Sequence, residues 1–373
     1  MQLSERGNGG IVLALAGVLL GGLPCRGQAP DQAPAVQQRA EPATAREGDK
    51  GRMTIHVTVT DKLGHHLDGL QASDFTLLDN KEPQKLLDFR ATDERSTGDP
   101  ARVVVVLDTI NVDFNVIAWV RQQVDAYLKE DGGKLGHPTT IAILSDRGIQ
   151  VAPGWTEDGN ELMAAFDKSQ SQLRIVGRSA GFYGATERLE MSLGQLGQLM
   201  EYESHQPGRK LMLTIGQGWP LLPMAGFEED MNQRDWVFNT IVHVTDGLRA
   251  AGITLYCLDP FQLGRTNPYY YQSYLKPVPE AKNAEYPDLA LQVLAEHSGG
   301  EVVINGHDIT DDLNLAVRDA GAGYDLTFEA PPGDRPNEYH ALQVQVDKPN
   351  AKVRTVAGYY ARPEAVGEKK KKK

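Results

Sequence analysis

The sequence predicts an α/β fold, in which helices cover both faces of a mainly parallel sheet and flanking β-strand units lie at the N- and C-terminal ends. Two observations predict it. Between residues 100 and 320, apolar runs such as 103–107 alternate with stretches of helical spacing such as 114–130, which is typical of a parallel sheet buried on both faces. On either side of this region, segments such as 53–59 alternate apolar and polar residues, which indicates half-buried strands.

The first 27 residues have the pattern of an export signal. A positive charge precedes an apolar stretch at 11–23 that is too short to span a bilayer comfortably, and small residues follow it. We therefore expect residues 1–27 to be a signal peptide, an exported protein that is periplasmic or secreted, and no transmembrane helix in the mature chain. The alternative is a lipoprotein modified at Cys25, although Pro24 is unlike the small residue that such sites want.

Three further segments flank the α/β region. Residues 28–50 are rich in Ala, Pro and Gln, so we expect a disordered linker. Residues 51–93 contain the alternating segment 53–59 and then a strand–turn–strand pattern, which together predict an N-terminal β unit. Residues 363–373 end in five lysines and are expected to form a disordered, solvated tail, with contact to an anionic surface as the alternative.

The α/β region is expected to span residues 100–320. Gly252 is a stop signal for one of its helices, and Asp308 is the expected N-cap of another. Ligands of such sheets bind at the carboxyl ends of the strands. The expected strands are 103–107, 139–145, 210–216, 253–259 and 301–305, and the expected helices are 114–130, 186–202, 236–252, 287–300 and 308–321.

Residues 321–362 form a C-terminal β unit with three expected strands, at 324–330, 339–347 and 351–360. A β unit of about 40 residues, such as 51–93, is too small to be stable alone. Our hypothesis is therefore that the two β units pack together as one discontinuous domain.

Charge and motif content exclude several functions. The net charge is −12, so a general nucleic-acid binder is not expected, because phosphate neutralisation needs a basic surface. Apart from Cys25 the chain contains one cysteine, Cys257, so neither an internal disulfide nor a CxxC metal motif is expected. The glycine-rich dinucleotide fingerprint and the Walker A loop are both absent.

Several motifs in order carry a resemblance to a known family. They are "VVVVLDTIN", "GRKLMLTIGQGWP", "GITLYCLDP", "LAEHSGGEVVINGHDITDDL", the leader "VTDKLGHHLDGLQASDFTLLDNKEPQKLLDF" and the closing "VRTVAGYYA". Over roughly residues 53–361 the chain resembles the von Willebrand factor type A (VWA) fold, in the version called the VWFA-related domain of acidobacteria. The resemblance implies a VWA-like, Rossmann-type arrangement of the central sheet.

The resemblance also implies where a metal site would lie. VWA domains typically bind Mg²⁺ at a metal-ion-dependent adhesion site, through a D-x-S-x-S loop, a later Thr and a second Asp, since Mg²⁺ prefers oxygen ligands. In this chain Asp108 matches the first Asp and Thr186 matches the Thr. The two serine positions hold Ile110 and Val112, and Ile215 stands at the second Asp.

We therefore expect a degenerate metal site and no cofactor. Asp108 is expected to cap nearby backbone amides at the strand end. The alternative is an Mg²⁺-dependent adhesion module, in which a reshaped loop brings in oxygens from Asn111 and Asp113, one position out of register.

An enzymatic function is not expected. The segment "GRSAG" fits the G-x-S-x-G pattern that presents a serine nucleophile in α/β-hydrolases, with Ser179 as the nucleophile. The preceding "QLRIV" is a weak strand and the next expected helix begins only near Thr186. A serine hydrolase using Ser179 therefore stays a lesser alternative.

Two long loops leave the carboxyl edge of the expected sheet, at 216–230 and 258–287. Exposed Tyr and Trp often anchor protein interfaces, so we expect a non-enzymatic, exported protein that binds a protein or a cell-envelope component through these loops. The alternative is that the aromatic side chains pack back onto the sheet as a lid. The expected partner-binding residues are Trp219, Phe227, Tyr269, Tyr270, Tyr271 and Tyr274.

Overall fold

In the computed structural model, all of the described residues belong to one of the two units of the chain, residues 43–373. The expectations for residues 1–27, 28–50 and 364–373 concern segments that lie outside the described residues. The structure describes residues 51–92, 101–112, 114–168, 181–216, 218–219, 229–260, 269–304 and 308–363.

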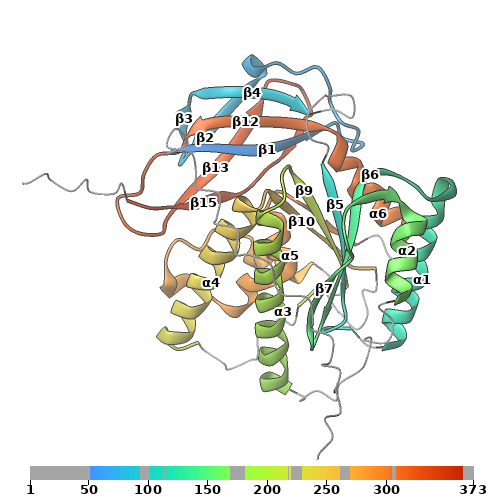
Figure 1. Ribbon diagram of the computed structural model, residues 1–373. Coiled ribbons are helices and arrows are strands. Elements are labelled where there is room, and N and C mark those ends of the chain that lie inside the picture. Colours follow the sequence, from blue (N-terminus) through green and yellow to red (C-terminus); the bar gives the residue numbers. More distant parts are fainter. Residues whose placement is uncertain are drawn as a thin grey trace, which may run out of the picture. The chain divides into compact units, whose positions relative to one another are not determined.

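The central element is a seven-stranded sheet in the order β11-β10-β9-β5-β6-β7, with β8 paired to β6 (Figure 1). The pairs from β11 through β10, β9 and β5 to β6 are parallel, whereas β7 and β8 run antiparallel to β6. The α/β class with a mainly parallel sheet is therefore confirmed. The strands are β5 Arg102–Asp108, β6 Lys134–Ser145, β7 Gly148–Val151, β8 Thr156–Asp158, β9 Lys210–Ile215, β10 Ile253–Leu258 and β11 Val302–Val303.

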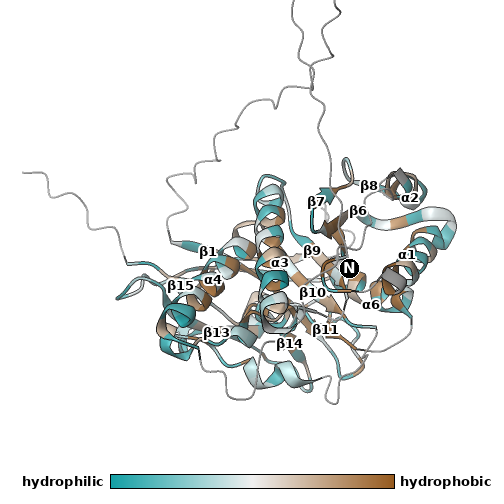
Figure 2. Ribbon diagram, turned by 90° about the horizontal axis from the view of Figure 1, so that it is seen from below, coloured by the Kyte–Doolittle hydropathy of each residue, from teal (hydrophilic) through white to brown (hydrophobic). Residues whose placement is uncertain are grey.

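Strand β5 shows why the central strands are almost continuously apolar. Val104 and Val106 belong to the hydrophobic core on one side of the sheet, and Val103 and Val105 belong to the core on the other side. Because successive side chains of a strand point to opposite faces, a strand that is covered on both faces has to be apolar at every position. Figure 2 shows hydrophobic residues along the central strands, between the helices.

Helices α3, α4 and α5 contribute to one core, and α1, α2 and α6 contribute to the other. Asp308 caps α6 as expected, accepting hydrogen bonds from the backbone N–H of Thr310 and Asp311. None of the described helices is long and apolar enough to cross a membrane. The helices are α1 Phe114–Lys129, α2 Gly159–Lys168, α3 Gly181–Ser204, α4 Met231–Ala250, α5 Leu291–His297 and α6 Ile309–Gly321, with 3₁₀ turns η1 Ala72–Asp74, η2 Glu130–Gly133, η4 Tyr270–Tyr274, η5 Ala281–Asn283 and η6 Tyr286–Leu289.

Three features of the α/β part differ from the sequence expectations. The hairpin strand β7, the short strand β8 and helix α2 were not expected. The two strands have only four and three residues, too few for a clear periodic signal. Helix α3 begins at Gly181, so Thr186 lies in its second turn and does not precede the helix. Helix α5 begins at Leu291, after the separate turn η6.

The β units at the two ends of the chain interleave in two four-stranded sheets. The sheets have the orders β14-β1-β12-β4 and β15-β13-β2-β3, so each contains strands from both ends. Residues of both sheets form one shared hydrophobic core, which includes Ile55, Leu77 and Phe328. The strands are β1 Arg52–Thr60, β2 Phe75–Asp79, β3 Glu82–Gln84, β4 Leu86–Thr92, β12 Gly323–Glu329, β13 Glu338–Val346, β14 Lys352–Arg354 and β15 Gly358–Ala361.

The last expected strand, 351–360, is wrong as a single element. It is divided into β14 and β15, which belong to different sheets. At the break, Thr355 Oγ1 donates to the backbone carbonyl of His56 and the N–H of Ala357 donates to the carbonyl of His297. The chain changes sheets here because its hydrogen-bonding groups find partners on two different elements.

A polar network joins the two four-stranded sheets, which we call the β sandwich, to the α/β part. Arg354, at the end of β14, pairs with Asp319 of α6 and, at 2.9 Å, with Glu301. The Tyr256 hydroxyl of β10 also donates to Asp319, and Arg354 lies over the Tyr256 ring. The network therefore links one strand of the sandwich to β10, to α6 and to the residue before β11.

The largely buried pair His56 and Asp325, whose side chains are 13% and 15% exposed, predicts a loss of stability in acid. Nδ1 of His56 lies 2.9 Å from Oδ1 of Asp325, and burial, reinforced by Arg209 and opposed by Asp325, lowers the pKa of His56 to about 4 from its ordinary value of 6.5. Between these two pH values the unfolded chain binds a proton at this histidine and the folded protein does not. The free energy of unfolding is therefore expected to fall, by up to about 3 kcal/mol, as pH drops through this window.

Urea unfolding at about pH 7 and about pH 4.5 measures this effect. His56→Gln keeps a donor for Asp325 but cannot titrate, so its stability should depend less on pH than that of the unaltered protein. Parallel pH profiles for the two proteins would show that His56 does not carry the acid sensitivity.

Candidate functional site

The candidate site lies at the carboxyl edge of the central sheet. Strands β5, β9 and β10 are neighbours, and Ile215 at the end of β9 is in register with Leu107 of β5 and Leu258 of β10. Asp108 ends β5 and Asp259 directly follows β10. The register therefore places the segments that follow these three strands next to one another, as expected for an α/β sheet.

Asp108 is buried and holds the loop that follows β5. Its Oδ1 accepts hydrogen bonds from the backbone N–H of Ile110 at 2.8 Å and of Asn111 at 3.2 Å. Its Oδ2 accepts a hydrogen bond from the Asn111 side-chain amide at 2.7 Å. The capping of backbone amides that the sequence predicted for Asp108 is therefore present, and both carboxylate oxygens take part in the loop structure.

The same loop is linked to helix α3. The Asn111 amide also donates to Oγ of Ser192 at 2.9 Å, and this hydroxyl donates to the carbonyl of Arg188 at 2.8 Å. Ser192 was missed in the sequence analysis. Its signal is a polar residue between Leu189 and Leu193 on the apolar stripe of the helix, a position at which a hydroxyl needs a buried partner.

The residues present do not fit the Mg²⁺ site that the family resemblance implies. Ile110 and Ile215 are buried in the hydrophobic cores, and Val112 is half-buried. None of these side chains supplies an oxygen. Thr186 is half-buried in α3, and no group of three or more His, Cys, Asp or Glu side chains in the described part of the chain is arranged to hold a metal ion. Asp113 and Ser179 lie outside that part.

The aromatic residues expected at this edge divide into two groups. Trp219 and Tyr271 are only 2% and 3% exposed, so their expected role as exposed partner-binding residues is corrected to packing. Trp219 lies in the core shared by α3, α4 and α5. Tyr271 packs on Val293 of α5 because turn η4 folds back onto that helix.

The other group remains accessible. Tyr269 is exposed, and Tyr270 and Tyr274 are half-buried beside α5. The Tyr270 hydroxyl lies 3.4 Å from the side-chain amide of Gln292. Phe227 lies outside the described residues. The same loops therefore hold aromatic side chains that pack into the core, as the lid alternative predicts, and one, Tyr269, that stays exposed. Partner binding by the accessible residues stays a prediction.

The structure adds exposed apolar residues at this edge that the sequence analysis missed. Tyr183 is 84% exposed near the start of α3, and Met231 and Trp236 are 58% and 38% exposed in the first two turns of α4. Together with Tyr269, which the sequence analysis did name and which is 51% exposed after β10, they are the strongly exposed apolar side chains described at this edge. In the sequence, the helix residues among them differ from core residues only in lying off the apolar stripe near the start of a helix. This pattern does not predict exposure unless the neighbouring elements are known.

This division predicts different effects for two neighbouring tyrosines. Tyr271→Ala is expected to lower the free energy of unfolding by about 3 kcal/mol, because it leaves a cavity against α5. Tyr269→Ala is expected to change it by less than about 0.5 kcal/mol, because the side chain is largely in water. Chemical denaturation of the two variants measures the difference, and equal losses would contradict the packing described above.

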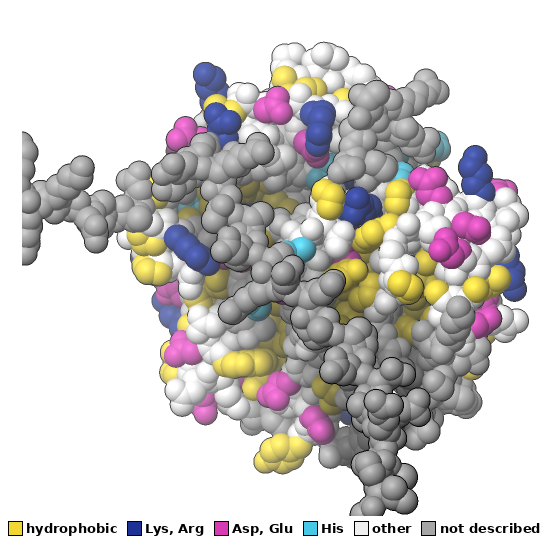
Figure 3. Space-filling view, in the orientation of Figure 1, with side chains coloured by type: hydrophobic (Ala, Val, Ile, Leu, Met, Phe, Trp, Pro, Cys, Tyr) yellow, Lys and Arg dark blue, Asp and Glu magenta, His cyan; other side chains and the backbone are white. Residues whose placement is uncertain are grey.

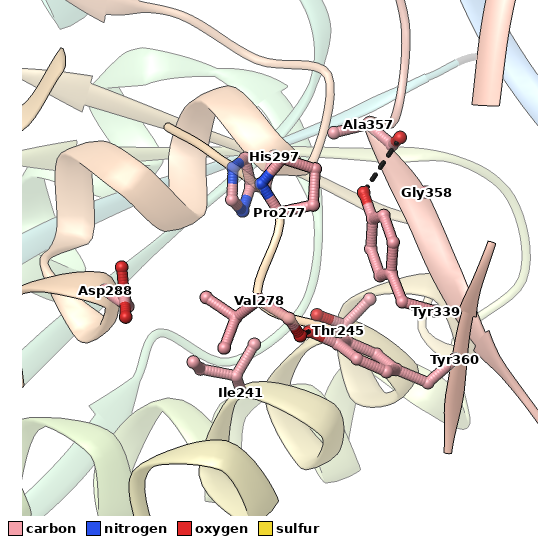
Figure 4. A pocket seen from close by; sticks show the side chains of 10 residues that line it. All are labelled: Ile241, Thr245, Pro277, Val278, Asp288, His297, Tyr339, Ala357, Gly358 and Tyr360. Atoms are coloured by element: carbon pink, nitrogen blue, oxygen red, sulfur yellow. Dashed lines mark hydrogen bonds between the residues drawn. The ribbon is translucent and has the colours of Figure 1, made fainter. Parts of the chain in front are cut away.

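A cavity of about 20 Å³ lies elsewhere, between α4, α5 and the β sandwich (Figure 4). Asp288, His297 and Tyr339 are among its lining residues. Burial raises the pKa of Asp288 to about 7, and burial lowers the pKa of His297. The space suits about one water molecule, so this cavity is not a binding site for a larger ligand.

Comparison with known proteins gives likenesses in structure only. No protein-family model and no curated protein matches the chain. The human COPII-coat protein Sec24c is 9% identical, with 72% of this chain and 44% of that chain covered and a TM-score of 0.34. The open pilus adhesin SpaC from Lactobacillus rhamnosus GG is 10% identical, with 79% and 49% covered and a TM-score of 0.35.

The SpRpn10 VWA domain is also similar, at 10% identity, with 58% of this chain and 94% of that domain covered and a TM-score of 0.29. The chain spans about half the length of the coat protein and of the adhesin that it matches. At such low TM-scores these likenesses carry no argument about function. The fold class follows from the sheet order and the helix placement by themselves.

Proposed function

We propose that this protein is a non-enzymatic VWA-like interaction module that binds a protein or cell-envelope component through the carboxyl edge of its sheet, without a metal ion. The single observation that carries the proposal is the bonding of Asp108. Its two carboxylate oxygens accept hydrogen bonds from the loop after β5. A carboxylate used in this way is poorly placed to bridge a metal to a partner.

Exposed apolar side chains support an interaction at the same edge. Tyr183, Met231 and Tyr269 stand near the starts of α3 and α4 and after β10. A partner could bury these side chains and gain affinity from apolar area and shape. In this mechanism the Asp108 loop keeps the edge rigid, and the neighbouring segments make the contacts.

We further propose that the protein acts outside the cytoplasm, as a periplasmic or secreted protein. The support is the apolar stretch at 11–23 with its flanking residues. The membership in the VWFA-related acidobacterial family is proposed on the motifs quoted above.

Site-specific photo-cross-linking in the cells that produce the protein tests the interaction. A photoreactive phenylalanine analogue is placed at Tyr269, or at Leu63, which is more exposed (81% against 51%) but lies in the turn after β1 of the β sandwich. We expect a cross-linked heteromeric product from position 269 that persists in EDTA, and none from position 63. Products from both positions, from neither, or only without EDTA would overturn the proposal.

A further inference from the structure

The exposed apolar residues of two adjacent helices form a definable surface. Helices α3 and α4 pack against each other, and both start at the carboxyl edge of the sheet. We use the term α3–α4 face for six exposed residues in the first three turns of the two helices. These residues are Tyr183, Glu187 and Glu190 of α3, and Met231, Asp235 and Trp236 of α4.

The charge of this face is negative. Residues 181–191 and 229–240 together contain five carboxylates and two arginines. Arg234 is engaged by Glu229 and by two carbonyls of the segment before η6, and Arg188 is half-buried. The carboxylates of Glu187, Glu190 and Asp235 are exposed, and no ion pair within the described residues involves them.

Aromatic rings lie among these carboxylates. The Trp236 ring packs on Tyr286 of η6, with ring centroids 5.8 Å apart. Burial raises the pKa of the Tyr286 hydroxyl, and the charges of Glu190 of α3 and of Glu229 and Asp230, which directly precede α4, raise it further. In Figure 3, hydrophobic and acidic side chains lie side by side on the lower part of the molecule, over the N-terminal halves of α3 and α4.

We propose that the α3–α4 face binds a basic partner segment, with Lys or Arg side chains set between Glu187, Glu190 and Asp235 and against the Trp236 ring. The inference rests on the proposed function and names the chemistry of its partner. Carboxylates attract the cations over a distance and pair with them, and an aromatic face adds a cation–π contact and apolar area. A metal-bridged adhesion site would select the opposite charge, an acidic group.

Three eight-residue fluorescent peptides test this proposal by anisotropy with the full-length protein at about 50 mM salt. They alternate Tyr with Arg, Gln or Glu. We expect the Arg peptide to bind at least ~10-fold more tightly than the Gln peptide, with weaker binding at higher salt. We expect no binding of the Glu peptide. Equal binding of the three peptides, or preference for the Glu peptide, would overturn the inference.

Matched variants locate the effect. The triple variant Glu187→Gln, Glu190→Gln, Asp235→Asn is expected to weaken Arg-peptide binding ~10-fold, and Trp236→Ala to weaken it ~5-fold. The control Glu82→Gln, Glu157→Gln, Glu161→Gln removes the same charge from exposed positions elsewhere, and should change binding less than ~2-fold. Equal losses in the two triple variants would show a net-charge effect and overturn the assignment to this face.

The two proposals fail in distinguishable ways. Cross-linking from position 269 together with no preference for the Arg peptide would overturn the basic partner and leave the interaction edge standing. Absence of cross-linking from position 269 would overturn the interaction edge itself, on which the basic partner rests. All six substituted residues of the two triple variants are exposed, so unchanged melting temperatures confirm that each variant is folded.

Discussion

Asp108→Ala is expected to lower the free energy of unfolding by about 3 kcal/mol. The substitution removes the acceptor of the N–H groups of Ile110 and Asn111 and of the Asn111 side-chain amide. These donors are buried, and a buried donor without an acceptor costs its full desolvation free energy. Urea denaturation followed by circular dichroism measures the loss.

Asp61 offers a matched control for this prediction. Its Oδ1 also accepts two backbone hydrogen bonds, from Leu63 at 2.7 Å and from His65 at 2.9 Å, but in an exposed turn. Asp61→Ala should therefore cost much less, because water replaces the lost acceptor. If both variants lose the same stability, or if Asp108→Ala loses none, Asp108 does not hold the loop in the way described.

Arg354→Met is expected to cost a similar amount, about 3 kcal/mol. The methionine keeps most of the apolar stem but leaves the carboxylate of Asp319, whose side chain is only 13% exposed, without its guanidinium partner. The contact of β14 with Glu301 is lost as well. Because this network joins the β sandwich to the α/β part, we also expect faster proteolysis of the sandwich strands.

The control for Arg354 is Arg362→Met. Arg362 pairs with Asp246 at 3.3 Å, but its side chain is 79% exposed, and exposed ion pairs contribute little to stability. Thermal unfolding of the two variants, followed by calorimetry, compares them directly. A larger loss for Arg362→Met than for Arg354→Met would contradict the role assigned to the network.

The alternation of strands and helices was predictable because each long element carries its own period. The run at 103–107 and the helix at 114–129 are local patterns, and the structure places them as β5 and α1. Short elements such as β7, with four residues, carry too few positions for a period to show. The division of 351–360 between two sheets depends on partners far away in the chain, at His56 and His297.

The candidate site was predictable only in its local part. The capping by Asp108 uses neighbours two and three residues away, whereas the link from Asn111 to Ser192 spans 81 residues. Likewise, residue type did not distinguish Trp219, which is buried, from Trp236, which is exposed. Exposure depends on which element packs over a side chain, and this is set by tertiary structure.

Isothermal titration of Mg²⁺ and of Mn²⁺ into the purified protein, with Asp108→Asn alongside, tests most directly whether the edge works without a metal. We expect no saturable heat at millimolar metal in either protein, because the carboxylate is bonded to its own loop and apolar residues stand at three of the other four ligand positions. Saturable binding that is lost in Asp108→Asn would contradict the metal-free mechanism. It would then point to a metal-bridged contact with an acidic partner group.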